Sequence, residues 1–186
     1  NSAEIAKKIY LEEHPDTKIH VIDSLSAGGE VDLIVRKLNH LVAEGLDFDQ
    51  VVDAITAYQA KTKLLFVLAK VDNLVKNGRL SKLIGTVVGL LNIRMVGEAS
   101  KTGTLKLLQK ARGQKKAIKA AFDELIKAGY TGGHITIAHR KNERFIEQFS
   151  ELIREKFAHE SIEVLPTSGL CSFYAEEGGL LMGYEI

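Results

Sequence analysis

The tetrapeptide Gly78–Arg79–Leu80–Ser81 places an arginine and a serine at the predicted start of an apolar helix over 80–91. From residue 83 to residue 97 the only charged side chain is Arg94. The first N–H groups of a helix have no partner inside the helix, and beside an arginine they favour a bound anion. The residues around Arg79 and Ser81 therefore predict a small anion-binding corner.

Two glycines follow at Gly85 and Gly89, and their four-residue spacing places them on one side of the predicted helix. Each glycine costs a helix about 1 kcal/mol relative to alanine, so the pair needs a compensating role. One interpretation is that a second helix packs closely against this smooth side. The other is that the side leaves a slot for a slender apolar ligand. An alkyl chain in that slot, with its carboxylate at the arginine, would be a fatty acid.

Other residues that could do chemistry form no recognisable catalytic or metal site. His134 and His139 flank one predicted strand without a cysteine or carboxylate cluster at ligand spacing. Glu176 and Glu177 are adjacent on a predicted loop, where carboxylates usually face water. The sequence has no Walker A loop, no dinucleotide-binding glycine motif and no nucleophile elbow. We therefore expect no catalytic residue, no metal and no cofactor.

The basic run Arg112–Lys119 stands at the start of another predicted helix. Lysine in the first turn of a helix opposes the helix dipole, which favours contact with an external acidic group. A solvated helix start is the alternative. Arg112 and Lys115 are thus candidates for binding a phosphate or an acidic partner.

Composition bounds the function classes. The chain has 186 residues, a net charge of +1, 45% hydrophobic residues and 26% charged residues, which is typical of a globular protein. The balanced charge argues against nucleic-acid binding.

The single cysteine, Cys171, excludes an intramolecular disulfide and fits a reducing, cytoplasmic location. We expect no stable membrane insertion, because no apolar run reaches the about 20 residues that a helix needs to span a bilayer. A helical pattern begins almost at Asn1 without an initiator methionine, so we expect an upstream segment.

Hydrophobic spacing and turn residues predict alternating helices and strands. In the first third we expect a helix to Glu13, a buried strand at 18–23, a Ser/Gly loop, and a helix that stops at Gly45. Asp47 and Gln50 predict a capping box for the next helix. A strand at 63–70 and a short helix at 71–76 follow, before the apolar helix already described.

Strands at 93–111 surround a predicted turn at Thr102–Gly103, and a helix over 113–129 follows. A strand at 133–140, a helix at 142–157, a strand at 161–167, and a tail with a loop and a last strand complete the chain. The alternation predicts an α/β fold with mostly parallel pairing and a small β-meander. We place a domain boundary near residues 58–63, which separates a unit 1–60 from a unit 61–186.

Several ordered motifs together resemble the DegV family of fatty-acid-binding proteins. They are "KIHVIDS" with its Ser/Gly loop, "LVKNGRLSK…GLLNIRMV" and "TGTL…ARGQKKA". The resemblance implies a two-lobed α/β fold, in which this chain holds the end of the first domain and the complete second domain. It also implies that one long-chain fatty acid binds between the domains. A separate fatty acid kinase subunit would phosphorylate that ligand to acyl phosphate for phospholipid synthesis, and the DegV protein itself would perform no chemistry.

The resemblance also implies site residues. Asn1–Ser2–Ala3 looks like the tail of the family's SGTYxSA motif, whose ligand-binding Thr and Ser would lie upstream. Tyr174 takes the position of a family histidine that contacts the carboxylate, and a phenol can still donate a hydrogen bond there. Arg112, with Lys115 beside it, becomes a candidate contact for the kinase subunit. The implied fatty-acid-binding set is Ser24, Ser26, Gly28, Arg79, Ser81, Gly85, Val88, Gly89 and Tyr174.

Two alternatives remain at this point. The chain could belong to a small α/β transferase that acts on phosphorylated substrates through Arg79, Arg112 and Lys115. It could also be a regulatory module without a lipid, in which the glycine side of the apolar helix packs against another helix.

Overall fold

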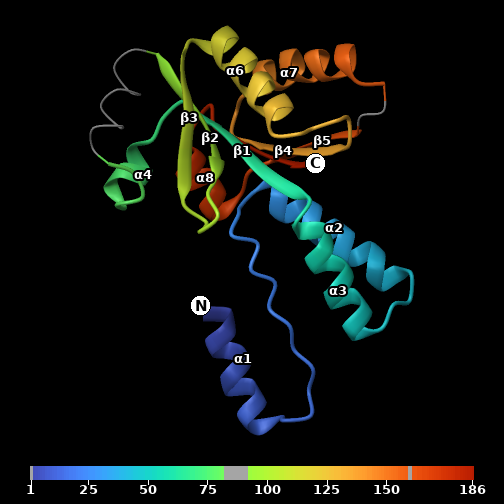
Figure 1. Ribbon diagram of the computed structural model, residues 1–186. Helices are drawn as coiled ribbons and strands as arrows, with labels where there is room; N and C mark the ends of the chain where they lie inside the picture. The colour runs from blue at the N-terminus through green and yellow to red at the C-terminus, as the bar shows by residue number, and fades with distance from the viewer. Residues whose placement is uncertain (1, 82–91, 159–160) are drawn as a thin grey trace.

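The computed structural model describes residues 2–81, 92–158 and 161–186, and its centre is a six-stranded sheet with helices on both faces (Figure 1). The strand order is β3-β2-β1-β6-β4-β5. The strands are β1 (Thr62–Leu68), β2 (Ile93–Ala99), β3 (Leu105–Arg112), β4 (His134–His139), β5 (Ser161–Pro166) and β6 (Leu180–Glu185). The predicted α/β class is confirmed.

The pairing directions correct one expectation. Among the described strands, only β4 and β5 pair in parallel, whereas β1–β2, β2–β3, β1–β6 and β4–β6 are antiparallel. The prediction of mostly parallel pairing was wrong for two reasons. β2 and β3 form a hairpin, and β6 returns at the end of the chain to lie between β1 and β4 in the opposite direction.

The helices divide between the two faces of the sheet. One face, which we call the α6 face, is covered by α6 and α7, which lie side by side in Figure 1. The other, the α2 face, carries α2, α4 and α8. The described helices are α1 (Ser2–Glu13), α2 (Gly29–Ala43), α3 (Phe48–Gln59), α4 (Asp72–Lys76), α6 (Gln114–Lys127), α7 (Glu143–Lys156) and α8 (Gly169–Ala175).

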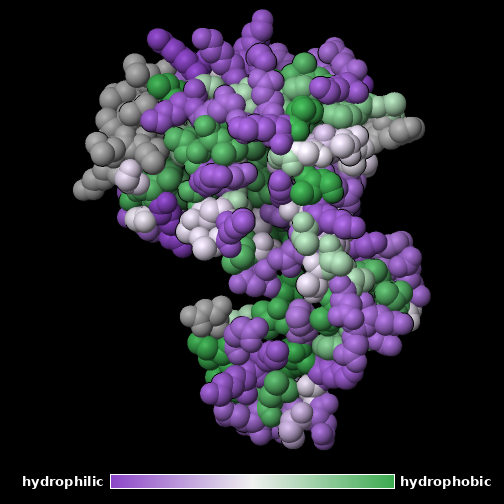
Figure 2. All heavy atoms as spheres, viewed as in Figure 1, coloured by the Kyte–Doolittle hydropathy of each residue, from purple (hydrophilic) through white to green (hydrophobic). Residues whose placement is uncertain are grey.

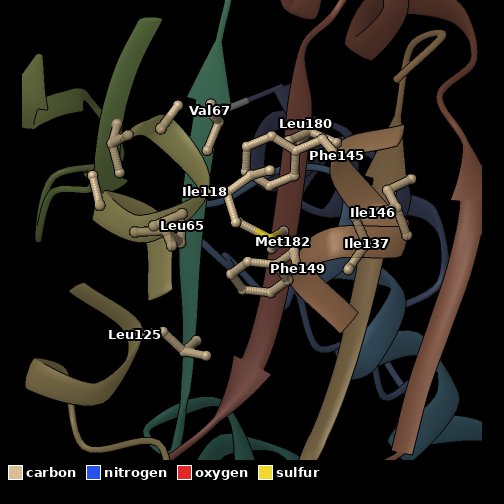
Figure 3. Packing of buried hydrophobic residues seen from close by; sticks show 14 of the residues in the cluster. Leu65, Val67, Ile118, Leu125, Ile137, Phe145, Ile146, Phe149, Leu180 and Met182 are labelled. Atoms are coloured by element: carbon tan, nitrogen blue, oxygen red, sulfur yellow. The ribbon is translucent and has the colours of Figure 1, made fainter. Parts of the chain in front are cut away.

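The α6 face holds the main hydrophobic core (Figure 3). Alternate residues of β1 and β6 point into it, and the apolar sides of α6 and α7 close it. Phe145 and Phe149 on α7 stack with ring centroids 5.9 Å apart. The labelled members of this core are Leu65, Val67, Ile118, Leu125, Ile137, Phe145, Ile146, Phe149, Leu180 and Met182. These residues follow the predicted helical and strand periodicities.

On the α2 face the backbone of α2 touches the sheet directly. A Cβ atom at Gly29 would overlap the carbonyl oxygen of Thr136, and one at Gly183 would overlap the backbone of Glu30. Glycine on both sides of the contact therefore lets the start of α2 sit on β6 without an intervening layer of side chains. The loop before α2 enters this contact at Gly28, whose φ is 58°.

The segment before α2 differs from its prediction. Residues 18–23 are extended but form no strand, because no described strand lies beside them to supply hydrogen bonds. The predicted buried strand is therefore wrong for this structure. α1 buries none of its residues, and its apolar side chains are visible at the surface in Figure 2. Ile5, Ile9 and Tyr10 are exposed by 55%, 60% and 48%. The domain boundary at 58–63 stays a prediction.

The predicted capping box of α3 is confirmed. The Asp47 carboxylate accepts the backbone N–H of Gln50 at 3.0 Å, and the Gln50 side chain accepts the N–H of Asp47 at 3.0 Å. α2 and α3 pack on each other through Ile34, Leu41 and Ile55. This small core fixes the two helices as one unit beside the sheet.

We expect the substitution Gly183→Ala in the full-length protein to lower the free energy of unfolding by about 3 kcal/mol, since the added methyl group must displace the start of α2. Ser161→Thr, which adds a methyl group to an exposed position of β5, serves as the matched control. Urea unfolding monitored by circular dichroism measures both. A loss at Gly183 no larger than that of the control would show that α2 does not depend on this contact.

Candidate functional site

An apolar cavity of about 200 Å³ lies on the α2 face. Strands β1 and β6 form its floor, α4 and α8 form its sides, and the tip of the β2–β3 hairpin closes one end. The lining residues are Ala27, Leu64, Phe66, Leu68, Leu74, Arg79, Gly103, Leu105, Leu170, Cys171, Tyr174, Ala175 and Leu181. Almost all of them are apolar, so the cavity suits a hydrocarbon rather than a polar metabolite.

The alternation of β1 makes the floor of this cavity apolar. Every second residue of a strand points to the same face, so Leu64, Phe66 and Leu68 all face the cavity. Leu65 and Val67 point into the core on the α6 face. β1 is therefore apolar on both faces. One face packs into the core, and the other faces the cavity.

Arg79 and Tyr174 form the polar end of the cavity. The guanidinium carbon of Arg79 lies 4.7 Å from the centroid of the Tyr174 ring, which is a cation–π contact. Among the described lining residues, Arg79 is the only charged one. Its planar N–H groups can donate hydrogen bonds in the plane while the face of the group remains on the ring. This end therefore suits a carboxylate at the head of an apolar chain.

Hydrogen bonds hold α4 and α8 together beside that end. The backbone N–H of Asn73 donates to the Glu176 carboxylate at 2.9 Å, and the Asn73 side-chain amide donates to the carbonyl oxygen of Phe173 at 2.8 Å. Glu176 adopts a φ of 53°, a conformation that glycine favours. The expectation that Glu176 simply faces water was wrong, since its side chain accepts a hydrogen bond from the start of α4.

A second, polar cavity of about 750 Å³ adjoins the first and shares Leu64 with it. Glu30, which is 5% exposed, lies at its inner wall. The Ser26 hydroxyl donates to Glu30 at 2.5 Å, and the Thr62 hydroxyl donates to the other carboxylate oxygen at 2.9 Å. These two hydrogen bonds compensate part of the cost of burying the carboxylate.

The structure separates the predicted ligand-binding residues into groups. Arg79 and Tyr174 meet at the apolar cavity. Ser24 lines the polar cavity, and Gly28 packs on Leu181, which belongs to the apolar cavity. All of these positions stay predictions as ligand contacts.

Ser26 and Ser81 are not among the described residues that line the apolar cavity, and both stay predictions as ligand contacts. The hydroxyl of Ser26 is engaged with the Glu30 carboxylate, and a second carboxylate beside it would be repelled. Ser81 is exposed and does not line the apolar cavity. Gly85, Val88 and Gly89, with the predicted helix that contains them, lie outside the described residues.

The candidate partner contacts lie elsewhere. Arg112 is exposed at the end of β3, and Lys115 lines a groove between α6 and α7. Arg79 belongs to the α2 face, so the described structure does not bring it together with Lys115. The arrangement gives no support to a transferase site built from Arg79, Arg112 and Lys115.

Sequence reasoning missed the contribution of α8 to the cavity. The tail before β6 was predicted as a loop, but it forms α8 and supplies Leu170, Cys171 and Ala175 to the wall. Leu170, Cys171 and Tyr174 do follow a helical spacing, although seven residues are too few for a reliable periodicity. Tyr174 was found through the family resemblance only.

The described part of the chain adds two observations on other site types. Among these residues no group of three or more His, Cys, Asp or Glu side chains could hold a metal ion. His139 instead accepts the backbone N–H of Asn142 on its Nδ1 atom at 3.2 Å. Within the same ranges, no helix combines the length and apolar character that crossing a bilayer requires.

The comparison with sequence families gives a match over residues 1–184 to a model described as an uncharacterised protein, DegV family. A DegV domain-containing protein of Streptococcus pneumoniae strain R6 is 77% identical over all 186 residues of the chain. The chain spans 66% of the length of that relative.

Solved structures show the same likeness. The chain superposes with a TM-score of 0.97 and 77% identity on the crystal structure of the Streptococcus pneumoniae Fatty Acid Kinase (Fak) B3 protein loaded with linoleic acid. It matches a DegV family protein from Eubacterium eligens loaded with heptadecanoic acid with a TM-score of 0.94 and 39% identity. All of this chain is covered in both cases, as are 66% and 67% of the two solved chains.

We expect Thr62→Val to lower the free energy of unfolding by about 1–3 kcal/mol, because the buried Glu30 carboxylate loses a donor. Thr56→Val on the exposed side of α3 is the matched control, and its effect should stay within about 0.5 kcal/mol. Thermal unfolding of the full-length protein compares the two. Equal, small effects at both positions would show that Glu30 does not need the Thr62 hydroxyl.

Proposed function

The chain belongs to the DegV family, and from this premise we propose that the full-length protein binds one long-chain fatty acid. The observation that carries the proposal is the apolar cavity on the α2 face, with Arg79 and Tyr174 at its polar end. Two similar solved proteins, from S. pneumoniae and E. eligens, were loaded with linoleic acid and heptadecanoic acid. The lining of this cavity has the chemistry that such ligands require.

Burial of the alkyl chain supplies most of the binding free energy in this proposal. Each methylene group removed from water contributes about 0.8 kcal/mol, so a long chain offsets the entropy lost on binding. The cavity of about 200 Å³ is smaller than most ligand sites. We therefore propose that part of the alkyl chain contacts groups beyond the residues that line this cavity.

Arg79 is proposed to hold the carboxylate, with Tyr174 as the surface that orients the guanidinium. A charge-assisted hydrogen bond to a carboxylate is stronger than one between neutral groups. Because an arginine stays charged at all ordinary pH values, head-group binding should not depend on protonation of this side chain.

The role of the loaded protein is also a proposal. We infer that it works in the cytoplasm and presents the fatty acid to a separate kinase subunit, which makes acyl phosphate for phospholipid synthesis. The name Fatty Acid Kinase (Fak) B3 of the S. pneumoniae relative supports such a partner. Arg112 and Lys115, which are both exposed, are the proposed contacts for it. The fatty-acid binding protein would itself perform no catalysis.

We expect the full-length protein, purified from bacteria, to carry a fatty acid that native mass spectrometry detects as a bound mass. Ala27→Phe should weaken palmitate binding about tenfold, since the added ring excludes about two methylene groups from the cavity. Ala57→Phe makes the same change at an exposed position of α3 and should bind as the wild type does. An empty wild-type protein that takes up no labelled palmitate would refute the proposal.

We expect Arg79→Met to weaken binding of palmitate by about ten- to a hundredfold. Binding of the methyl ester, which carries no charge, should change much less. Competition against a fluorescent fatty acid measures both ligands. If the variant loses affinity for acid and ester equally, Arg79 supports the cavity wall and does not recognise the carboxylate.

A further inference from the structure

Arg94 on β2 carries a partly buried guanidinium group, two of whose nitrogen atoms lack a hydrogen-bond partner in the described part of the chain. Its Nε and Nη1 atoms are buried and have no hydrogen-bond acceptor among the described residues. Burial lowers the pKa of this guanidinium, yet an arginine remains a cation near neutral pH. Buried N–H donors without an acceptor are costly, so these two nitrogen atoms favour an acceptor-rich anion.

Gln114 also has a buried donor that lacks an acceptor in the described structure. It is the first residue of α6, and the donor is its Nε2 amide group. In the hairpin, Arg94 pairs with Ala111, three residues before Gln114 in the chain. The unsatisfied atoms of both side chains are N–H donors. A single acceptor-rich ligand could therefore satisfy both.

The start of α6 lacks negative charge, whereas α7 carries the exposed Glu143 in its first turn. α6 begins after Gly113 without a side-chain cap, and its first turn contains Lys115 and Lys116 but no acidic residue. The exposed side chain of Arg112 precedes it. The first N–H groups of α6 and the positive end of its dipole thus add to the demand for an anion.

α7 begins at the same edge of the sheet. The pairings make β3 and β4 run in the same direction, and each is followed by a helix on the α6 face. Asn142, which precedes α7, makes no side-chain cap, and its side-chain amide nitrogen donates to the carbonyl oxygen of Gly178 at 2.7 Å. Nη1 of Arg94 lies 3.6 Å from the position that a Cβ atom at Gly178 would occupy. The guanidinium therefore lies close to Gly178, to which Asn142 binds in front of α7.

A groove of about 730 Å³ lies between α6 and α7. Gln114, Lys115 and Arg144 line it at the helix starts. Its acidic lining residues, Asp123 and Glu151, lie at least two turns farther along the helices. Asp123 is also neutralised by Lys119, whose Nζ atom lies 2.8 Å away.

We propose that the edge where α6 and α7 begin is a binding site for a phosphate-type oxyanion, with Arg94 and Gln114 as its buried donors. The anion is either free inorganic phosphate or the phosphoryl group of a phosphorylated ligand such as a nucleotide. This site lies on the α6 face, so it is separate from the fatty-acid cavity on the α2 face. It stands whether or not the proposed fatty-acid function holds.

The test uses the full-length protein, titrated with inorganic phosphate and separately with an adenine nucleotide by calorimetry. We expect saturable binding to the wild type, and binding about ten- to a hundredfold weaker to Arg94→Met. Lys8→Met removes one exposed positive charge from α1 and is the matched control, with unchanged binding expected. Tighter binding of the nucleotide, with the same sensitivity to Arg94, would identify a phosphorylated ligand as the source. Equal binding would identify free phosphate.

Melting temperatures separate a general structural effect of Arg94→Met from the loss of the proposed anion site. Arg94→Met removes two buried donors that lack an acceptor in the described structure, so its melting temperature without phosphate should not fall. Phosphate should then raise the melting temperature of the wild type but not that of the variant. If Arg94→Met does not fold, Gln114→Leu replaces it in both measurements. No saturable binding to the wild type, or equal binding to wild type and variant, would overturn the proposal.

Discussion

The backbone of α2 rests directly on β6, because glycine occupies both sides of their contact at Gly29 and Gly183. Most helices are held away from a sheet by a layer of side chains. Here that layer is absent, so the loop before α2 is brought down to the sheet. Ser26 can then reach the buried Glu30 carboxylate, and Ala27 and Gly28 reach the end of the apolar cavity. Residues of this loop and of the start of α2 thus line both cavities of the α2 face.

Alternate residues of β1 face opposite sides of the sheet, and the two sides have different roles. Leu65 and Val67 point into the buried core that α6 and α7 cover. Leu64, Phe66 and Leu68 point to the α2 face, where α4 and α8 leave an open apolar space. A shift of one residue in the register of β1 would exchange the two sets. The packing of Leu65 and Val67 in the core therefore determines which residues of β1 form the wall of the proposed ligand site.

Local signals in the sequence predicted most elements but not how they assemble. Helical spacing predicted α6 and α7, and the Asp47–Gln50 pair predicted the start of α3. The direction of pairing could not be predicted, because it depends on where β6 enters the sheet after all other strands. The anion-binding corner at Arg79 could be predicted, because its neighbours in the chain indicate the start of a helix. Its stacking on Tyr174 could not be predicted, since residues far apart meet only after α4 and α8 are joined by Asn73 and Glu176.

The position of a bound fatty acid with a terminal bromine atom tests the central claim most directly. Anomalous diffraction from crystals of the full-length protein would locate the bromine atom, and the electron density would locate the carboxylate. The account predicts a carboxylate beside Arg79 and an alkyl chain that runs over Phe66 and Leu181 on the α2 face. An alkyl chain in the groove between α6 and α7, or one that avoids the α2 face altogether, would contradict it.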